Sequence, residues 1–199
     1  MARAIHAAPL PSPDAPARPV AVVALTAPAA TLATRLAELS AQHGPFGLPI
    51  ARGAFRAVVA TDDPRAEWRY GRALPFPVRI LHSAEMAPRA AALALIAAEA
   101  PWAVLVLPAP GVPIPHDLVH SLLSGMAPSK DAAMREVAGA RHLALRPALA
   151  MVLPEGQEAA ALMLGGFRVA RAMPAPEAPP PPRRPGMLER WVMRRLELA

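Results

Sequence analysis

The sequence predicts an α/β domain in which a mostly parallel sheet is flanked by helices. Short apolar runs alternate with segments that carry leucine or alanine at helical spacing, and this alternation is typical of parallel strands joined by crossover helices. The first run, residues 20–25, contains no polar residue, as in a strand that is buried on both faces. Apolar residues make up 54% of the 199 residues, which is enough to fill one core of ordinary size.

The first half of the chain predicts four strands and two helices. A helix over 31–42 follows the strand 20–25, and Thr26 is placed to cap it; its apolar face is formed by Leu32, Leu36 and Leu39. Two further strands are predicted over 55–60 and 78–81. An alanine-rich helix over 87–100, with a proline in its first turn, leads to a strand over 102–107.

The second half gives weaker patterns. Pro115 is expected to open a helix that continues through Ser124 and ends at Gly125. Beyond it the residue types predict a helix over 131–138, a strand over 141–146 and a helix over 155–164, which Gly165 and Gly166 end.

Proline-rich stretches divide the chain into four parts. Residues 1–18 are predicted to be a flexible leader, 19–172 the α/β domain, 173–186 a linker and 187–199 an amphipathic helix. This last helix has arginines beside an apolar face that includes Trp191, so it suits either an anionic membrane surface or docking on a protein, its own domain or a partner. Its apolar residues are Leu188, Trp191, Val192 and Leu196, and its arginines are Arg190, Arg194 and Arg195.

Composition excludes several classes of function. The chain has no cysteine, so disulfides, thiolate catalysis and zinc–sulfur sites are ruled out. The net charge of +6 comes almost wholly from scattered arginines without stacking aromatics, which argues against a nucleic-acid partner. No apolar run approaches the length of a membrane span, and the N-terminus is a poor secretion signal. We expect a cytoplasmic protein, peripheral to the inner face of a membrane if its last helix binds lipid.

A parallel sheet directs attention to the carboxyl ends of its strands, where ligands of such folds bind. The residues predicted there are Thr26, Asp62 with Asp63, His82 and the Pro108–Ala109–Pro110 turn. His116 and His120 are four residues apart on the predicted helix, a spacing that allows two metal ligands. No third metal ligand lies on the same side of this helix, so we interpret both as surface histidines.

The order of these landmarks resembles that of family-2 glycosyltransferases, which have the GT-A fold, a Rossmann-like arrangement. The similarity covers residues 20–167. A strand ending in Asp62-Asp63, a Trp-led strand over 102–107, a basic strand over 141–146 and the Gly165-Gly166-Phe167 turn follow one another as in that family.

The resemblance implies a site for a nucleotide-diphosphate sugar. Asp62 and Asp63 match the position whose carboxylate accepts hydrogen bonds from the base or ribose, and we expect Thr26 and Asp62 to line an open cleft with residues near Pro110. The alternative for the acidic pair is an ordinary polar turn after a strand.

Two parts of the family's chemistry are missing. Pro108-Ala109-Pro110 stands where the family has an Asp-x-Asp motif, so no metal ligands and no metal cofactor are predicted. Arg168-Val169-Ala170-Arg171 stands where the general base is found. Arg168 and Arg171 could neutralise phosphate, and Glu155 or Glu158 could act as a base, but no spacing supports these roles, so catalytic residues are left unassigned.

Two functions from different classes therefore remain. The first is a glycosyltransferase-like protein that handles a nucleotide sugar, for example in surface polysaccharide synthesis, without ordinary metal-dependent transfer. The second is a non-catalytic interaction or membrane-peripheral scaffold module that acts through its C-terminal helix. The sequence leaves open whether the protein is an enzyme.

Overall fold

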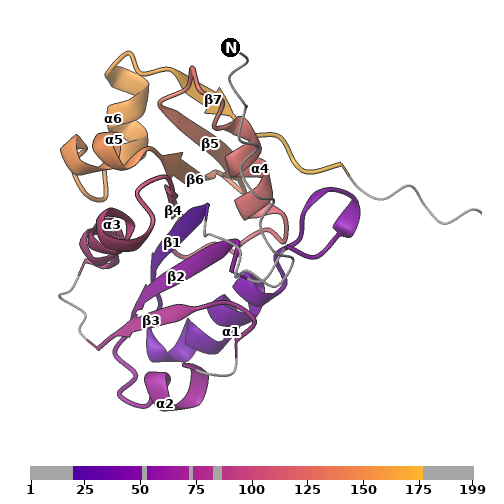
Figure 1. Cartoon of the computed structure of the whole chain (residues 1–199), viewed down its shortest axis with the longest axis vertical. Helices are drawn as coiled ribbons and strands as arrows, with labels where there is room; N and C mark the ends of the chain where they lie inside the picture. Colours follow the sequence, from indigo (N-terminus) through magenta and orange to yellow (C-terminus); the bar gives the residue numbers. More distant parts are fainter. Residues whose placement is uncertain (1–19, 51–52, 72–73, 83–86, 177–199) are drawn as a thin grey trace, which may run out of the picture.

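The computed structural model describes residues 20–50, 53–71, 74–82 and 87–176. Seven strands, six α-helices and one short 3-10 helix are formed within these residues (Figure 1). In chain order they are β1 (Ala21–Thr26), α1 (Ala29–Ser40), η1 (Pro45–Gly47), β2 (Phe55–Ala60), α2 (Ala66–Tyr70), β3 (Val78–Leu81), α3 (Pro88–Glu99), β4 (Val104–Leu107), α4 (Leu118–Gly125), β5 (Ala132–Val137), β6 (Ala140–Leu145), α5 (Pro147–Val152), α6 (Glu158–Leu164) and β7 (Val169–Arg171).

The strands form one sheet in the order β3-β2-β1-β4-β6-β5-β7. All neighbours are parallel except β6, which runs antiparallel to both β4 and β5. The chain moves outward from β1 to β2 and β3, then returns to place β4 on the other side of β1. The strand order therefore reverses between β1 and β4. The mostly parallel, helix-flanked sheet predicted from the sequence is confirmed.

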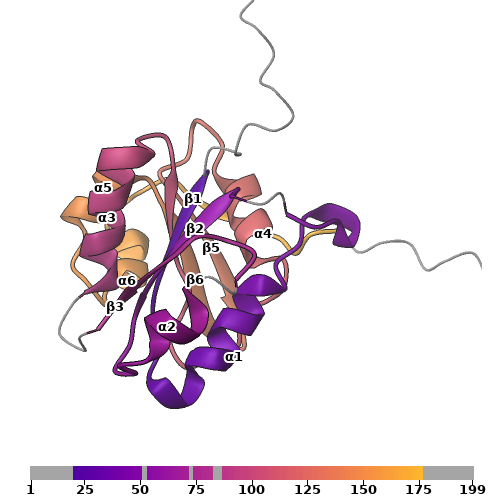
Figure 2. The same ribbon diagram turned by 60° about the horizontal axis from the view of Figure 1, so that its bottom comes forward.

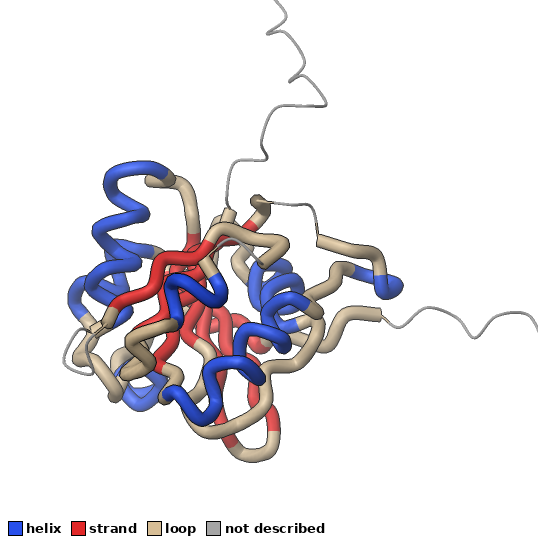
Figure 3. Tube along the Cα trace, turned by 90° about the horizontal axis from the view of Figure 1, so that it is seen from below, coloured by secondary structure: helices blue, strands red, loops and turns tan. Residues whose placement is uncertain are grey.

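Helices cover both faces of this sheet (Figures 2 and 3). On one face, Leu32, Leu36 and Leu39 of α1 share a buried cluster with β1, β2 and the apolar side of α4. On the other face, α3, α5 and α6 pack against the alternate residues of β1, β2, β4 and β6. Because β1 contributes buried side chains to both clusters, its uninterrupted apolar run is required by its central position.

One predicted helix is wrong. Residues 131–138 were expected to be helical, yet β5 occupies Ala132–Val137 and pairs with β6 along its whole length. Ala, Met, Arg and Glu favour helices intrinsically, but the gain from two neighbouring strands exceeds this preference. Ala138 and Gly139 both have positive φ (50° and 78°), as a two-residue hairpin turn requires, and they join β5 to β6.

Other differences are smaller. Thr26 does not cap α1: the helix follows Pro28, and no side chain of its own N-cap residue bonds to it. The helix expected from Pro115 begins at Leu118, and the helix expected from residue 155 begins at Glu158. The short elements α2, α5 and β7 were not predicted at all.

Residues 173–176 continue from β7 along α4. The Ala175 N–H donates to Asp117 Oδ2 at 2.6 Å, and the Phe46 N–H donates to the Pro176 carbonyl at 2.9 Å. The predicted leader 1–18, most of the linker 173–186 and the amphipathic helix 187–199 lie outside the described residues. No helix within the described ranges is long and apolar enough to cross a membrane.

Candidate functional site

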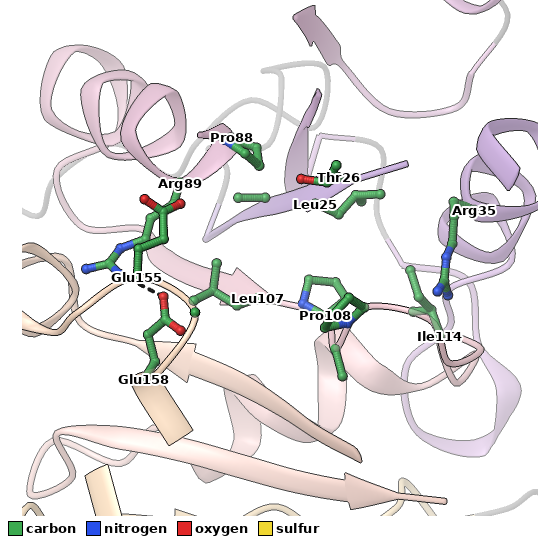
Figure 4. A pocket seen from close by; sticks show the side chains of 14 residues that line it. Leu25, Thr26, Arg35, Pro88, Arg89, Leu107, Pro108, Ile114, Glu155 and Glu158 are labelled. Atoms are coloured by element: carbon green, nitrogen blue, oxygen red, sulfur yellow. Dashed lines mark hydrogen bonds and ion pairs between the residues drawn. The ribbon is translucent and has the colours of Figure 1, made fainter. Parts of the chain in front are cut away.

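A pocket of about 210 Å³ opens where the strand order reverses (Figure 4). The depression lies beyond the carboxyl ends of β1 and β4, where the loops to α1 and α4 leave the sheet and α3 begins. One wall of the pocket is formed by the end of β1, at Ala24, Leu25 and Thr26. Another is formed by residues 107–110, at the end of β4 and just after it. The pocket therefore occupies the position at which open α/β sheets bind their ligands.

A second recess, of about 530 Å³, adjoins the pocket along the exposed side of α1. It shares Thr26, Arg35 and Pro110 with the pocket, so the two are adjacent, and we call them together the switch-point groove. The pocket alone is smaller than the roughly 300–1,000 Å³ usual for drug-sized ligands. A ligand of nucleotide-sugar size would therefore have to extend from the pocket into the recess.

Arg35 stands on one side of the pocket and is already bound within the protein (Figure 4). Its Nη1 donates to Glu38 Oε2 at 3.0 Å and also to the Val112 carbonyl. Glu38 Oε2 in turn accepts from the Ile114 N–H at 3.1 Å. The pair thus joins α1 to the loop after β4, and it fixes that wall of the groove.

Arg89 stands on the opposite side and is likewise bound (Figure 4). The buried guanidinium donates to Glu158 Oε1 at 2.7 Å, to the Leu153 carbonyl at 2.6 Å and to the Ala150 carbonyl. Since the two carbonyls end α5 and Glu158 begins α6, Arg89 links the first turn of α3 to both helices. Glu158 is therefore a structural partner and is not placed as a base.

Glu155 differs from Glu158 although both line the pocket. Its side chain is exposed, and it makes no ion pair or hydrogen bond with any residue in the described ranges. It lies in the turn between α5 and α6, beside Gly156, whose φ of +77° is accessible to glycine at little cost. The structure thus separates two glutamates that the sequence could not distinguish.

The Pro108–Ala109–Pro110 turn is held from behind by His142. The Ala109 N–H donates to His142 Nδ1 at 3.1 Å, so in the neutral ring Nε2 carries the proton. His142 is fully buried, and among the described residues its Nε2 has no hydrogen-bond partner. Burial, and then the positive charges of Arg135 and Arg35, lower the pKa of His142 to about 4.

The groove does not fit a divalent metal. The turn after β4 offers no side-chain oxygen, and Glu38 and Glu158 are bound to arginines. Over residues 20–50, 53–71, 74–82 and 87–176 there is no group of three His, Cys, Asp or Glu side chains that could hold a metal ion. Hard cations such as Mg²⁺ and Mn²⁺ need several oxygen ligands, so no chemical step is derived through a metal here.

The predicted nucleotide residues are only partly brought together. Thr26 lines both parts of the groove with Pro110, as expected, whereas Asp62 and Asp63 line neither part. Asp62 follows β2, the strand next to β1. Its Oδ1 accepts from the Ala29 N–H at 2.6 Å, so this side chain caps α1 although it is 33 positions away in the sequence. Its Oδ2 accepts no hydrogen bond from the described part of the chain.

Asp63 has a local structural role. Its Oδ1 accepts from the Arg65 N–H at 2.9 Å, and its Oδ2 lies 3.8 Å from Arg69 Nη1. These contacts form the polar turn that leads into α2, which is the alternative interpretation of the acidic pair.

The remaining candidates lie elsewhere. His116 precedes α4 and its ring is 6.3 Å from that of His43, while His120 Nε2 is 3.4 Å from Ser124 Oγ. Arg168 is held by both oxygens of Asp131, at 3.0 and 3.2 Å. Neither Arg168 nor Arg171 lines the groove, because β7 is the edge strand farthest from β1 on that side.

Comparisons with known proteins give only distant likenesses. No protein-family model matches the chain, and no curated protein matches its sequence significantly. Among solved structures, a homologue of Mycobacterium tuberculosis Rv0371c from Mycobacterium sp. strain JC1 is similar with a TM-score of 0.42 and 17% identity, over 89% of this chain and 98% of that chain. CMP:2-keto-3-deoxy-manno-octonic acid synthetase, solved with CTP, gives a TM-score of 0.45 and 16% identity, over 91% of this chain and 100% of the other. Neither likeness assigns a ligand or an activity to this chain, and the resemblance to family-2 glycosyltransferases stays a prediction.

Proposed function

We propose that the chain is a glycosyltransferase-like protein that binds a nucleotide sugar in the switch-point groove, without a divalent metal and without ordinary metal-dependent transfer. The observation that carries this proposal is the coincidence of the groove with the point at which the strand order reverses. The groove has a smaller pocket beside a larger recess, which suits a ligand with a sugar at one end and a nucleoside at the other.

The polar groups around the groove suit hydroxyl-rich ligands. The Thr26 hydroxyl and the Glu155 carboxylate can both accept hydrogen bonds from sugar or ribose hydroxyls. Apolar residues such as Leu25, Leu107 and Ile114 provide much of the pocket wall, so a sugar ring would also contact hydrocarbon. This combination of an apolar wall and a few convergent polar groups is usual for small-molecule sites.

The same groups explain why we do not propose metal-dependent transfer. A diphosphate becomes a good leaving group when its developing charge is neutralised, and a bound divalent cation normally does this. The groove lacks the ligands for such a cation, and Nη1 of Arg35 and both Nη atoms of Arg89 are directed to protein oxygens. Binding of the nucleotide sugar therefore does not imply its cleavage.

The test is calorimetric titration with UDP, GDP, TDP and their sugar conjugates, with and without Mn²⁺. Thr26→Val is the decisive variant, because it keeps the shape of the side chain and removes the hydroxyl that lines both parts of the groove. Losing one neutral hydrogen bond should weaken binding about fivefold. We expect this loss with an unchanged melting temperature and no effect of Mn²⁺. Absence of nucleotide binding, or binding that needs Mn²⁺, would refute the proposal.

The interaction-module alternative has one observation in its favour. Large apolar side chains are exposed at the ends of the two helices α5 and α6: Met151 (68%), Val152 (73%), Met163 (58%) and Leu164 (88%). These side chains lie at the C-terminal ends of two consecutive helices, and a contiguous exposed apolar patch is typical of a surface that meets a partner. If no nucleotide binds, this surface is the next place to test by substitution.

A further inference from the structure

The switch-point groove has more acidic than basic side chains. Two arginines and three glutamates line the pocket and recess, so with all five ionised the groove has one excess negative charge. Arg35 is paired with Glu38 and Arg89 with Glu158, both with side chains less than a fifth exposed. The excess charge is therefore that of Glu155, whose carboxylate has no cation partner within the described residues.

The two arginines are not free to turn toward a ligand. Arg89 would leave Glu158 and two helix-end carbonyls without their donor, and Arg35 would leave Glu38 and the Val112 carbonyl. A single ligand contact does not offset the loss of either pair, because the carboxylate left behind would be buried or half-buried without its cation. Glu155, by contrast, can turn toward a ligand without breaking any contact.

The rest of the wall does not compensate the charge of Glu155. Pro88, Leu107, Pro108 and Ile114 make much of this wall and carry no charge. A phosphate placed beside Glu155 would be repelled, and a neutral sugar hydroxyl would gain an ordinary hydrogen bond. A protonated amine would gain both a hydrogen bond and the charge interaction.

We propose that the ligand portion entering the pocket beside Glu155 carries a protonated amino group, so that the substrate class is an amino-sugar nucleotide. This inference rests on the proposed function for its nucleotide part, and on Glu155 and the two occupied arginines for its amine part. The nucleotide would lie in the recess along α1, which holds Thr31 and Thr34 and is away from Glu155.

The experiment compares UDP, UDP-glucose and UDP-glucosamine by calorimetry, at a pH below the pKa of the sugar amine. Wild-type protein should bind UDP-glucosamine about tenfold more tightly than UDP-glucose, the usual value of one charge-assisted hydrogen bond. Glu155→Gln should lose this preference and leave UDP binding unchanged. Glu136→Gln is the matched control: it removes the same charge from an exposed glutamate on β5 that does not line the groove, and it should keep the preference.

Two failures can be told apart. If all three ligands bind but without preference, or if Glu155→Gln keeps the preference, the amine inference is wrong and the proposed function stands. If none binds, the proposed function is wrong. The inference is then decided by titrating free glucosamine and glucose into ¹⁵N-labelled protein. Amide shifts at Gly156 that appear only with glucosamine, and only when Glu155 is present, would support it; their absence would overturn it.

Discussion

Acidification should destabilise this protein through one buried histidine. His142 is neutral in the folded protein because burial and then the charges of Arg135 and Arg35 lower its pKa to about 4, whereas in the unfolded chain the value is near 6.5. As the pH falls below 6.5, the unfolded chain binds the proton before the folded protein does. The histidine therefore lowers the free energy of unfolding progressively from pH 6.5 to about pH 4, and its contribution levels off below that.

The size of the effect follows from the shift. Each pKa unit corresponds to about 1.4 kcal/mol, so a shift from 6.5 to about 4 gives a full penalty of about 3 kcal/mol. Most of this appears early: between pH 7 and pH 5 the loss is about 2 kcal/mol. That is a large share of the roughly 5–15 kcal/mol by which domains of this kind are stable.

The assay is urea unfolding at a series of pH values for wild type and His142→Asn. The Asn Oδ1 takes the position of Nδ1 and can still accept from the Ala109 N–H, but Asn does not titrate. The comparison is needed because carboxylates also contribute: despite burial, which acts to raise it, the pKa of Asp117 is lowered by hydrogen bonds from Ala175 and Arg135, and such a group loses stabilisation in acid. The difference between the proteins should change by about 2 kcal/mol from pH 7 to pH 5, in favour of the variant. Parallel pH profiles would refute the reasoning.

Two further predictions concern contacts that shape the groove. Asp62→Ala removes the carboxylate that caps α1 and should lower the free energy of unfolding by about 1 kcal/mol, while Asp62→Asn should cost little. Urea unfolding of the two variants measures this difference. Equal loss of stability in both variants would contradict the capping role. Arg89→Met leaves Glu158 buried without its partner and should lower the free energy of unfolding by about 3–5 kcal/mol. The double variant with Glu158→Gln should recover part of that loss, as urea unfolding would measure. A double variant no more stable than Arg89→Met would show that the ion pair does not account for the loss.

The sequence predicted the framework of the fold well because local pattern and tertiary position agree there. The runs that become β1, β2 and β4 are mostly apolar because these inner strands are covered on both faces, and α1 and α3 carry apolar residues at helical spacing because one side of each packs on the sheet. Pro88 in the first turn of α3 also behaves as its local preference requires. The order of these elements was therefore readable along the chain.

Prediction failed where distant pairing decided the outcome. Residues 132–137 have helix-forming composition, but β6 and β7 are available on either side of them, and the ladder they complete determines a strand. In the sequence, only Gly139 could have indicated the hairpin turn, because glycine is common at positive φ and alanine, as at position 138, is not. The short elements α2, α5 and β7 contain too few residues to show a period.

The candidate site divides in the same way. From the sequence by itself came the class of sheet, the edge of that sheet at which a ligand is expected, and the absence of metal ligands after the Trp-led strand, because these depend on residue type and order alone. Only the tertiary structure decided which charged groups are free. Arg89 and Glu158 are 69 positions apart, and Asp62 reaches Ala29 across 33, so their pairing cannot be deduced from spacing. Glu155 stands out for the same reason: a side chain is available for a ligand only when the folded chain provides it with no other partner.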